Sequence, residues 1–526
     1  MTKRNPAREQ PAQAAPNPGP PLARWRVLAT VFTTGAAVLV VEIAGARVVS
    51  PLYGSGLYSW SALISVTLAA LSLGYWVGGR AADRRPDTAV FHGGILLAGL
   101  LVVAIPAMAG PILRVTEPLD PRLGVLLAAA LLFFLPLAVL GGVTPFAIRL
   151  SRPPQGEVGA VSGLIFAVST VGSLLAALAT GFLLIPNLGV RAILALTGAA
   201  IMLTAIAGFL LSGRRALGGV SAGLLVLALL AWRGAGAGES SGSLRIVART
   251  PSFFGFLRVV ETDAERMLTV NGIGQNYLSL LPDAEHYPYL VFMSSLPRLM
   301  RASDTPATGL LIGLGAGELV GLLTSQGVEM TAVELDPRVE ELARRHFGLS
   351  LPHERVRILD GRVFLERDRG RYDFVFIDAF LGEDVPGHLY SREALAAVRR
   401  RLAPGGALAI NYTTLTGGED ARALMKTLQA VFAHVKAYTD GAPASDLASM
   451  VLVASDEPIA FPGAARSELP APRLFLANEL RLETAGARIL TDDYNPINTY
   501  RLGANRLWRQ AMIRHIGEDW AYWADF

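Results

Sequence analysis

The chain has 526 residues, of which 52% are hydrophobic and 17% are charged, and its formal net charge is +4. A typical soluble protein carries about 25% charged residues, so the composition argues against an ordinary cytosolic globular protein. Cysteine is absent, which excludes disulfides, thiolate metal sites and cysteine nucleophiles.

The charge is divided unevenly along the chain. Residues 1–235 carry 17 Lys and Arg against 7 Asp and Glu, whereas the remaining residues carry 30 against 36. A basic, apolar first half is typical of a membrane domain with cationic loops, and an acidic second half argues against a nucleic-acid partner. We therefore expect the lipid bilayer, and no nucleic acid, among the partners of this protein.

The chain begins with residues 1–23, which are rich in proline, lack aromatic residues and are predicted to form a disordered tail. Residues 24–232 then contain about seven apolar segments, each close to or above the ~20 residues that a helix needs to cross a bilayer. These segments are about 27–46, 58–79, 90–113, 123–148, 158–185, 189–211 and 216–232. The pattern predicts a polytopic α-helical membrane domain in the cell (inner) membrane.

The arginines of the connecting segments predict the orientation of this domain. They are concentrated in alternate segments, beginning with the N-terminal tail, so the positive-inside rule places the N-terminus in the cytoplasm. Seven crossings would then place the second half of the chain outside. If residues 216–232 lie in the membrane interface instead, six crossings return it to the cytoplasm.

The composition changes after the last apolar segment. Residues 233–245 are rich in glycine and serine and are predicted to be a linker, and residues 246–283 read as a small β-strand domain. From 284 to 505, strand patterns alternate with helical patterns, which predicts an α/β Rossmann-like domain with a mainly parallel sheet. Residues 506–526 are expected to form an aromatic, helical tail.

A glycine-rich turn is the sharpest local signal in the second half. Gly313, Gly315 and Gly317 follow an apolar strand, and Glu334 ends the next predicted strand about 20 residues later. Glycines let the backbone approach a nucleoside, and an acid at that position accepts hydrogen bonds from both ribose hydroxyls. The spacing therefore predicts a nucleoside site.

Two further carboxylates, Asp360 and Asp378, also follow apolar strands. Ligands of open α/β sheets bind outside the carboxyl ends of the strands, so we expect both to converge with Glu334 on one crevice. The histidines are dispersed, with no pair at metal-ligand spacing, and we expect no metal. His388, in a predicted lid loop near Asp384, is the histidine whose role most needs a test.

Several motifs together resemble a known family. They are Val270–Gln275, Asp283–Tyr287, the glycine-rich turn, Glu334, Asp360-Gly361, Asp378 and Leu490–Pro496. With these motifs, residues 245–505 resemble the spermidine synthase family of polyamine aminopropyltransferases, which has a class I methyltransferase-like fold. The preceding apolar segments make the chain similar to the membrane-bound branch of that family.

The resemblance implies a reaction. An aminopropyl group would pass from decarboxylated S-adenosylmethionine to a small-molecule amine, with release of methylthioadenosine. By the same resemblance, Gln275 would contact the tail of the donor, Glu334 its ribose, and Asp360, next to Gly361, its adenine amino group.

The resemblance also implies roles for three other residues of the crevice. Asp378 would be the catalytic base, and Tyr287 would orient the amine. Asp493 would line the same crevice or stabilise the lid beside it. Members of the family often pair their catalytic domains, which leaves a homo-oligomer open.

The chain departs from the family pattern at three places. The acid that favours the decarboxylated donor is replaced by Ala316. The second acid that reads the diamine is missing unless Glu383 or Asp384 replaces it from a longer loop. The Tyr-His-Glu motif of the family becomes Tyr287–Tyr289, with Pro and Tyr at its second and third positions.

These departures keep alternatives open. One is an S-adenosylmethionine-dependent methyltransferase, which Ala316 favours. Another is a transporter or sensor with a regulatory nucleoside-binding domain, because Glu42 lies inside the first apolar segment, where an ionisable group is costly. Adenosyl sulfonium donors are made in the cytosol, and on this ground we expect the catalytic domain to face the cytoplasm.

Overall fold

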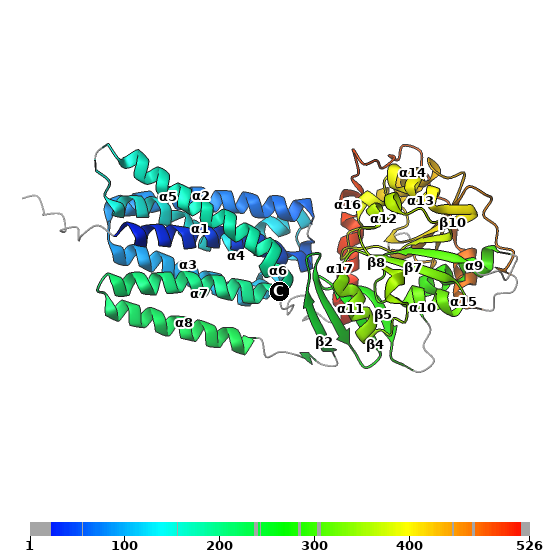
Figure 1. Cartoon of the computed structure of the whole chain (residues 1–526), viewed down its shortest axis with the longest axis horizontal. Helices are drawn as coiled ribbons and strands as arrows, with labels where there is room; N and C mark the ends of the chain where they lie inside the picture. Colours follow the sequence, from blue (N-terminus) through cyan, green and yellow to red (C-terminus); the bar gives the residue numbers. More distant parts are fainter. Residues whose placement is uncertain are drawn as a thin grey trace, which may run out of the picture.

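The computed structural model describes residues 23–516, apart from 55, 155, 236–239, 242–243, 282–285, 302–306, 444–445 and 465–468. A bundle of long helices leads into a small antiparallel sheet and then into a larger sheet covered by helices (Figure 1). This order confirms the predicted fold class. The predicted tail lies outside the described residues except for residue 23, and so do residues 517–526 of the predicted C-terminal tail.

Six helical segments of the bundle are long and apolar enough to cross a membrane. They are α1 (Arg24–Tyr53), α2 (Leu57–Arg84), α3 (Thr88–Thr116), α4 (Pro121–Ser151), the continuous segment Val158–Asn187 and α7 (Val190–Leu211). The continuous segment consists of α5 (Val158–Ala179), a π-helical stretch (Thr180–Leu184) and α6 (Ile185–Asn187). A seventh apolar helix, α8 (Arg215–Ala235), is shorter over its described apolar part, Arg215–Ala231.

Helix α8 lies along the bundle and contacts α7 and α3. Successive long helices reverse direction, so the chain enters the bundle at one end and leaves it at the other, where the rest of the protein packs (Figure 1). A helix in the membrane interface would instead lie across the end of the bundle. The arrangement of α8 thus differs from the interfacial position considered for residues 216–232.

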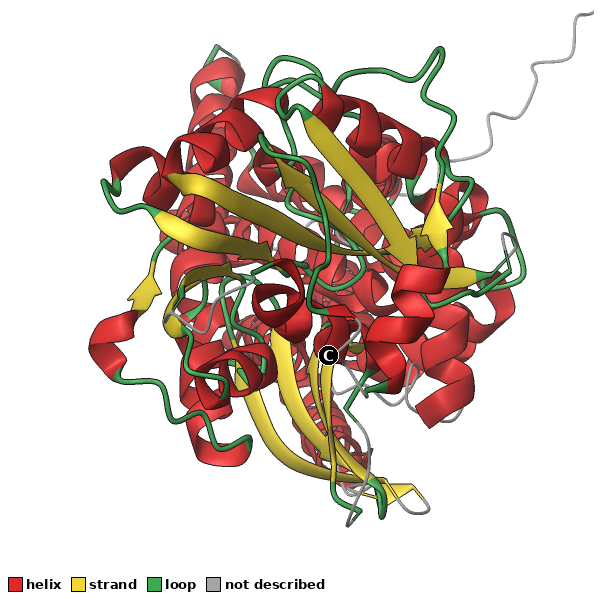
Figure 2. Ribbon diagram, turned by 90° about the vertical axis from the view of Figure 1, so that its right-hand side faces the viewer, coloured by secondary structure: helices red, strands yellow, loops and turns green. Residues whose placement is uncertain are grey.

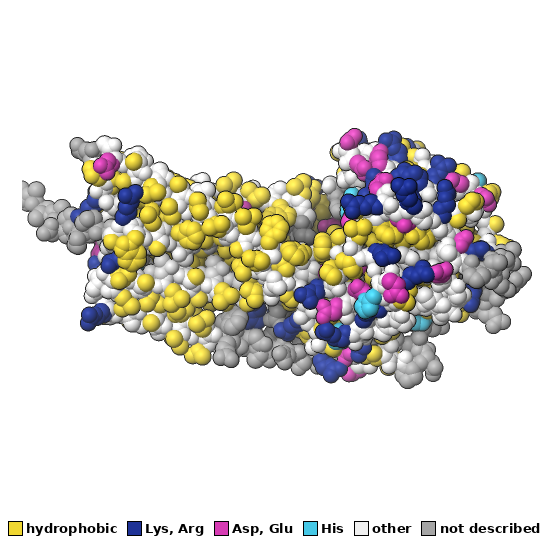
Figure 3. All heavy atoms as spheres, in the orientation of Figure 1, with side chains coloured by type: hydrophobic (Ala, Val, Ile, Leu, Met, Phe, Trp, Pro, Cys, Tyr) yellow, Lys and Arg dark blue, Asp and Glu magenta, His cyan; other side chains and the backbone are white. Residues whose placement is uncertain are grey.

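Large apolar side chains cover the outside of the bundle. Leu123 and Phe182, for example, are 62% and 66% exposed, and Figure 3 shows hydrophobic side chains over the visible face of the bundle. Charged side chains gather instead at its far end and on the part of the molecule that contains the two sheets. An exposed apolar surface of this extent is the surface that lipid covers in a membrane protein.

The small β domain is a five-stranded antiparallel sheet with its strands in sequence order. Its strands are β1 (Ser240–Ser241), β2 (Leu244–Pro251), β3 (Phe256–Glu261), β4 (Glu265–Val270) and β5 (Ile273–Ser279). Arg47 of α1 donates a hydrogen bond from Nη2 to the carbonyl oxygen of Phe253 at 2.8 Å. The sheet is therefore attached directly to the end of the bundle.

The larger sheet has eight strands in the order β13-β11-β12-β10-β9-β6-β7-β8. They are β6 (Thr308–Ile312), β7 (Glu329–Glu334), β8 (Val356–Ile358), β9 (Tyr372–Ile377), β10 (Leu402–Leu415), β11 (His434–Thr439), β12 (Leu447–Ser455) and β13 (Glu479–Leu480). The pairs from β10 to β8 are parallel, whereas β11, β12 and β13 pair antiparallel. Because β6 lies between β7 and β9, the strand order reverses there, at the position where open α/β sheets bind ligands.

Helices cover both faces of this sheet (Figure 2). They are α9 (Pro288–Met300), α10 (Glu318–Ser325), α11 (Pro337–His346), α12 (Gly361–Arg367), α13 (Arg392–Arg401), α14 (Glu419–Gln429) and α15 (Pro470–Ala477). Short 3-10 turns lie at His353–Arg355 and Gly387–Leu389. The sheet interior is apolar on both faces because parallel strands are buried on both sides.

The last two helices are α16 (Ile497–Tyr500) and α17 (Leu502–Ile516), so α17 crosses the boundary expected at residue 505. The Trp508 ring of α17 packs edge-on against the ring of Phe380 at 5.3 Å. Tyr277 of β5 donates a hydrogen bond from its hydroxyl to Sδ of Met512 at 2.8 Å. Helix α17 is therefore an integral part of the unit that both sheets form with their helices. Because the sequence predicts the active site in this unit, we call it the catalytic unit.

Candidate active site

The glycine-rich turn between β6 and α10 forms the base of the site. Gly313 has φ +91°, and a Cβ there would lie 2.1 Å from the carbonyl oxygen of Asp378. The neighbouring Gly315 faces Asn276, whose Oδ1 accepts a hydrogen bond from the backbone N–H of Ala316 at 2.9 Å. Gly317, also predicted as a donor contact, packs against Leu349. Because glycine has no side chain, the backbone of the turn can lie close to the backbone at the end of β9.

A cavity of about 100 Å³ opens above this turn. Its lining includes most of the predicted donor-binding residues and the predicted base, namely Gln275, Gly313, Gly315, Glu334, Asp360, Gly361 and Asp378. We call it the donor cavity. The sequence analysis did not identify Asn276, although it directly follows Gln275 and lines the same cavity.

Glu334 ends β7 with its carboxylate turned toward the glycine-rich turn. Oε2 accepts a hydrogen bond from the backbone N–H of Leu314 at 3.0 Å, and Oε1 accepts one from the backbone N–H of Asp336 at 2.9 Å. Burial raises the pKa of Glu334, and these backbone donors counteract the rise. The carboxylate is therefore held in place with free lone pairs for a ribose.

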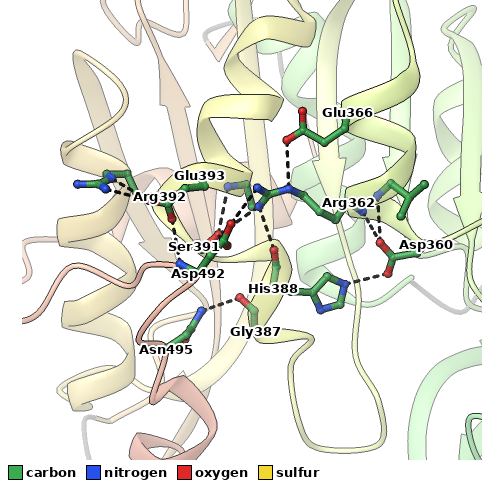
Figure 4. Close-up of polar contacts among 12 residues, drawn as sticks. Asp360, Arg362, Glu366, Gly387, His388, Ser391, Arg392, Glu393, Asp492 and Asn495 are labelled. Atoms are coloured by element: carbon green, nitrogen blue, oxygen red, sulfur yellow. Dashed lines mark hydrogen bonds and ion pairs between the residues drawn. The ribbon is translucent and has the colours of Figure 1, made fainter.

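Asp360 caps helix α12 and contacts His388 (Figure 4). Oδ1 accepts hydrogen bonds from the backbone N–H groups of Arg362 and Val363 at 2.9 and 3.0 Å. Oδ2 lies 2.8 Å from Nε2 of His388, which also lines the donor cavity. Because one oxygen is occupied by the helix cap, His388 and an adenine amino group would share the other.

Asp378 lies at the end of β9, on the floor of the donor cavity. Its Oδ1 accepts a hydrogen bond from Nδ2 of Asn411, on the adjacent strand β10, at 2.8 Å. Burial raises the pKa of Asp378 to about 6, the Asn411 hydrogen bond opposes the rise, and the nearby charge of Glu318 adds to it. A carboxyl group with this pKa is mostly ionised at pH 7 and is suited to accept a proton.

A second acid, Glu318, lies close to Asp378 and was missed by the sequence analysis. Its side chain is 9% exposed, and Oε1 lies 2.5 Å from Nδ1 of His286. Oε2 is buried and has no hydrogen-bond partner among the described residues. Glu318 directly follows the glycine-rich turn, and this position is the signal that could have identified it.

Tyrosines surround these two acids. Tyr287 is 39% exposed and its ring lies 5.0 Å from that of Tyr277. Burial raises the pKa of Tyr287 to about 12, with added effects of the Glu265 and Glu318 charges. Tyr289, where the family has an acid, also has its pKa raised, first by burial and then by Asp378 and Glu318. Tyr287 does not line the donor cavity, and Asp283 lies outside the described residues.

Three predicted substrate-binding acids lie away from the donor cavity. Glu383 and Asp384 line a different cavity, beside the helical bundle. Asp493 is exposed, whereas the adjacent Asp492 accepts hydrogen bonds from Ser391 and from Arg362 (Figure 4). Within the described part of the chain, no three His, Asp or Glu side chains form a group that could hold a metal ion.

The sequence comparisons identify relatives over most of the chain. Polyamine aminopropyltransferase 2 of Streptomyces coelicolor is 30% identical over 473 residues, which cover 80% of each chain. This chain belongs to the polyamine aminopropyltransferase family. No protein-family model matches the sequence.

Other relatives match shorter parts of the chain. An N-terminal histidine N-methyltransferase of Emericella nidulans is 28% identical over 263 residues, 45% of this chain and 46% of the relative. A polyamine aminopropyltransferase of Vibrio vulnificus is 39% identical over 112 residues, 20% of this chain and 38% of the relative. The matches to these two relatives, and to two further curated relatives, span less than half of each relative's length. A probable spermidine synthase structure from Corynebacterium glutamicum, 19% identical, covers 47% of this chain and 96% of its own, with a TM-score of 0.40.

The carboxylate of Glu334 yields a prediction for this family member. Glu334→Gln replaces the carboxylate by a neutral amide with one acceptor oxygen, so a charge-assisted hydrogen bond from a ribose hydroxyl is lost. Such bonds contribute about 1.5–3 kcal/mol, and we expect methylthioadenosine to bind roughly 10- to 100-fold more weakly in calorimetric titration. The matched control is Glu329→Gln, at the exposed start of the same strand. Equal affinities of the two variants would refute the assignment.

Proposed function

We propose that this protein transfers an aminopropyl group from decarboxylated S-adenosylmethionine to a small-molecule amine and releases methylthioadenosine. The observation that carries the proposal is the convergence of Gln275, Glu334, Asp360 and Asp378 on one cavity at the switch point of the sheet. Membership of the polyamine aminopropyltransferase family supports it.

In this proposal, the residues of the donor cavity hold the adenosyl sulfonium. Glu334 binds the ribose hydroxyls, and Asp360 with His388 reads the adenine amino group. Gln275, which also donates a hydrogen bond from Nε2 to the carbonyl oxygen of Gly382 at 3.0 Å, contacts the tail of the donor. These contacts leave the sulfonium near Asp378. The negative charge of the Asp378 carboxylate offsets the positive charge of the sulfonium.

The reaction is a displacement at carbon. The lone pair of the neutral amine attacks the aminopropyl carbon next to the sulfonium, the C–S bond breaks, and its electron pair goes to sulfur. Asp378 accepts the proton that the amine loses as the new C–N bond forms. Asn411 keeps the carboxylate in position through its hydrogen bond.

Asp378→Asn is expected to lower kcat about 10²–10⁴-fold, because the base is removed while its shape is kept.

For the wild type, kcat/KM for the donor at saturating amine should fall below pH 6, because protonation of Asp378 abolishes the base. Asn411→Leu removes the hydrogen bond that lowers this pKa, so the acidic limb should move to higher pH. Rates of product formation, followed by mass spectrometry across the pH range, test both statements.

Asp456→Asn, on an exposed acid away from the donor cavity, is the control. A full rate for Asp378→Asn, or an acidic limb that Asn411→Leu does not move, would contradict the assignment of Asp378.

We infer that Glu318 binds the ammonium end of the amine. Both amine-reading acids of the family pattern are replaced in this chain, and Glu318 is a buried acid with an oxygen that has no hydrogen-bond partner among the described residues, and its charge raises the pKa of Asp378. The rings of Tyr277 and Tyr287 add an aromatic wall, which also favours a cation.

Glu318→Gln keeps the shape of the side chain and removes the charge. We expect KM for the amine to rise about tenfold or more, since a desolvated ion pair is lost, while the affinity for methylthioadenosine stays within a factor of two. The control is Glu265→Gln, an acid of β4 that contacts His515 instead. An unchanged KM in Glu318→Gln would remove Glu318 from the amine site.

A second candidate function is methyl transfer from intact S-adenosylmethionine. Two observations favour it: Ala316 stands where the family has the acid that selects the decarboxylated donor, and a histidine N-methyltransferase is among the relatives. With both donors present, methylthioadenosine as product identifies aminopropyl transfer, and adenosylhomocysteine identifies methyl transfer.

We further propose that the catalytic unit and the N-terminus lie on opposite sides of the cell membrane. The chain enters the bundle at one end and leaves it at the other (Figure 1). The entry end carries Arg24, Arg26, Arg80, Arg84, Arg85, Arg149, Arg152, Arg214 and Arg215. The positive-inside rule then places the catalytic unit outside, in place of the cytoplasmic side expected from donor supply.

Reporter fusions test this topology. A reporter active only in the cytoplasm should be active before Met1 and silent after Phe526, and a reporter active only outside should give the reverse. Activity of one reporter at both ends would show that α8 does not cross and would return the catalytic unit to the cytoplasm.

A further inference from the structure

A second cavity, of about 130 Å³, lies where the helical bundle meets the catalytic unit. The bundle contributes the end of α1, the start of α2 and the segment after α3, and the catalytic unit contributes α16, α17 and the loop that carries Glu383 and Asp384. Figure 3 shows a recess between the two parts of the molecule, with acidic side chains in it. We call this the junction cavity.

One wall of the junction cavity is a buried ion pair between Glu383 and Arg509, whose side chains are 6% and 7% exposed. The pair lies against Gly54, the residue that follows α1. Gly54 has φ +75° and ψ 172°, a conformation that is essentially restricted to glycine. A Cβ there would lie 2.6 Å from Oε1 of Glu383. The backbone of the bundle therefore contacts the catalytic loop directly.

Asp384 has no cationic side chain bonded to it among the described residues. Its Oδ1 accepts a hydrogen bond from Nδ2 of Asn505 at 2.8 Å. Burial raises its pKa, while Asn505 and the more distant Arg501 counteract the rise. Oδ1 of Asn505, itself 7% exposed, is buried with no hydrogen-bond partner among the described residues. An acid that bonds only a neutral amide and an amide oxygen that lacks a donor are thus adjacent.

The other residues that line the cavity indicate which kind of ligand would donate hydrogen bonds to Asp384 and Asn505. Three carboxylates, of Glu117, Glu383 and Asp384, face two guanidiniums, of Arg506 and Arg509, so the balance favours a cation. Leucine side chains of both domains suit a short hydrocarbon chain. A 150 Å³ cavity holds benzene, which has six heavy atoms, so this cavity of about 130 Å³ has room for roughly five.

We propose that the junction cavity binds a small primary amine as its ammonium ion, with Asp384 as counter-ion and Asn505 as hydrogen-bond acceptor, at a site separate from the reaction. The loop from Asp378 to Pro386 borders both cavities, because Phe380 and Leu381 line the donor cavity. A turn in which the N–H of Leu381 bonds the carbonyl oxygen of Asp384 at 2.8 Å connects the two walls. Amine in the junction cavity therefore holds the loop that forms part of the donor site.

Titration of n-butylamine into the full chain in phosphatidylcholine nanodiscs tests the site without any turnover. Glu318→Gln serves as the background, because it weakens the amine subsite of the reaction. In this background we expect one equivalent to bind, and Asp384→Asn to weaken that binding at least tenfold. Asp263→Asn, on an exposed turn of the small sheet, is the matched control. n-Butanol, of equal size and without charge, should not bind.

Leu119→Trp fills the cavity from the bundle side and leaves Asp384 intact, so it should remove the same equivalent. Binding of methylthioadenosine confirms that each variant is folded. Unchanged butylamine affinity in either Asp384→Asn or Leu119→Trp, or equal binding of n-butanol, would overturn the proposal. Failure of aminopropyl transfer would leave these binding results untouched, so the two hypotheses fail separately.

Free primary amines and the headgroup of phosphatidylethanolamine both carry a primary ammonium group. Repeating the titration in nanodiscs that contain this lipid distinguishes the two sources. Weaker apparent binding of butylamine there assigns the site to the lipid headgroup, and unchanged binding assigns it to soluble amines. Either result requires the site to exist.

Discussion

The buried pair of Glu383 and Arg509 is the contact on which the arrangement of the molecule depends. It lies against the backbone of Gly54, so the end of the first long helix, the loop after β9 and the last described helix meet at one point. Removing one partner of a buried pair costs about 3–5 kcal/mol, because the other charge stays desolvated. The helical bundle is thereby coupled to the loop that lines the donor cavity.

The chemistry of the site follows from carboxylates held in apolar surroundings. Burial makes ionisation of Asp378 and Glu318 costly and raises the pKa of both, and the charge of Glu318 adds to the rise at Asp378. Two cations, a sulfonium and an ammonium, would relieve that cost together. The site is therefore better suited to the charged reactants than to a neutral ligand, which is the property required of a transferase that joins them.

The helical bundle contributes to the catalytic unit through two contacts at its end. Arg47 bonds the small sheet, and the segment at Gly54 closes the junction cavity. The catalytic unit packs on the bundle end opposite the start of α1, and α17 lies between the two parts (Figure 1). The fusion therefore places the junction cavity at the end of the helical bundle, between the two parts of the molecule.

The sequence by itself determined the features that depend on local pattern. Apolar length predicted the long helices, strand and helix alternation predicted the sheet, and the residues that end its strands predicted Glu334, Asp360 and Asp378, because parallel strands place their carboxyl ends at one edge. Only the tertiary structure decided which side chains meet across distant segments. Asn411 reaches Asp378 from the next strand, Glu318 lies beside it, and Asp384 turns toward the bundle. These contacts depend on side-chain direction after packing, for which sequence spacing carries no signal.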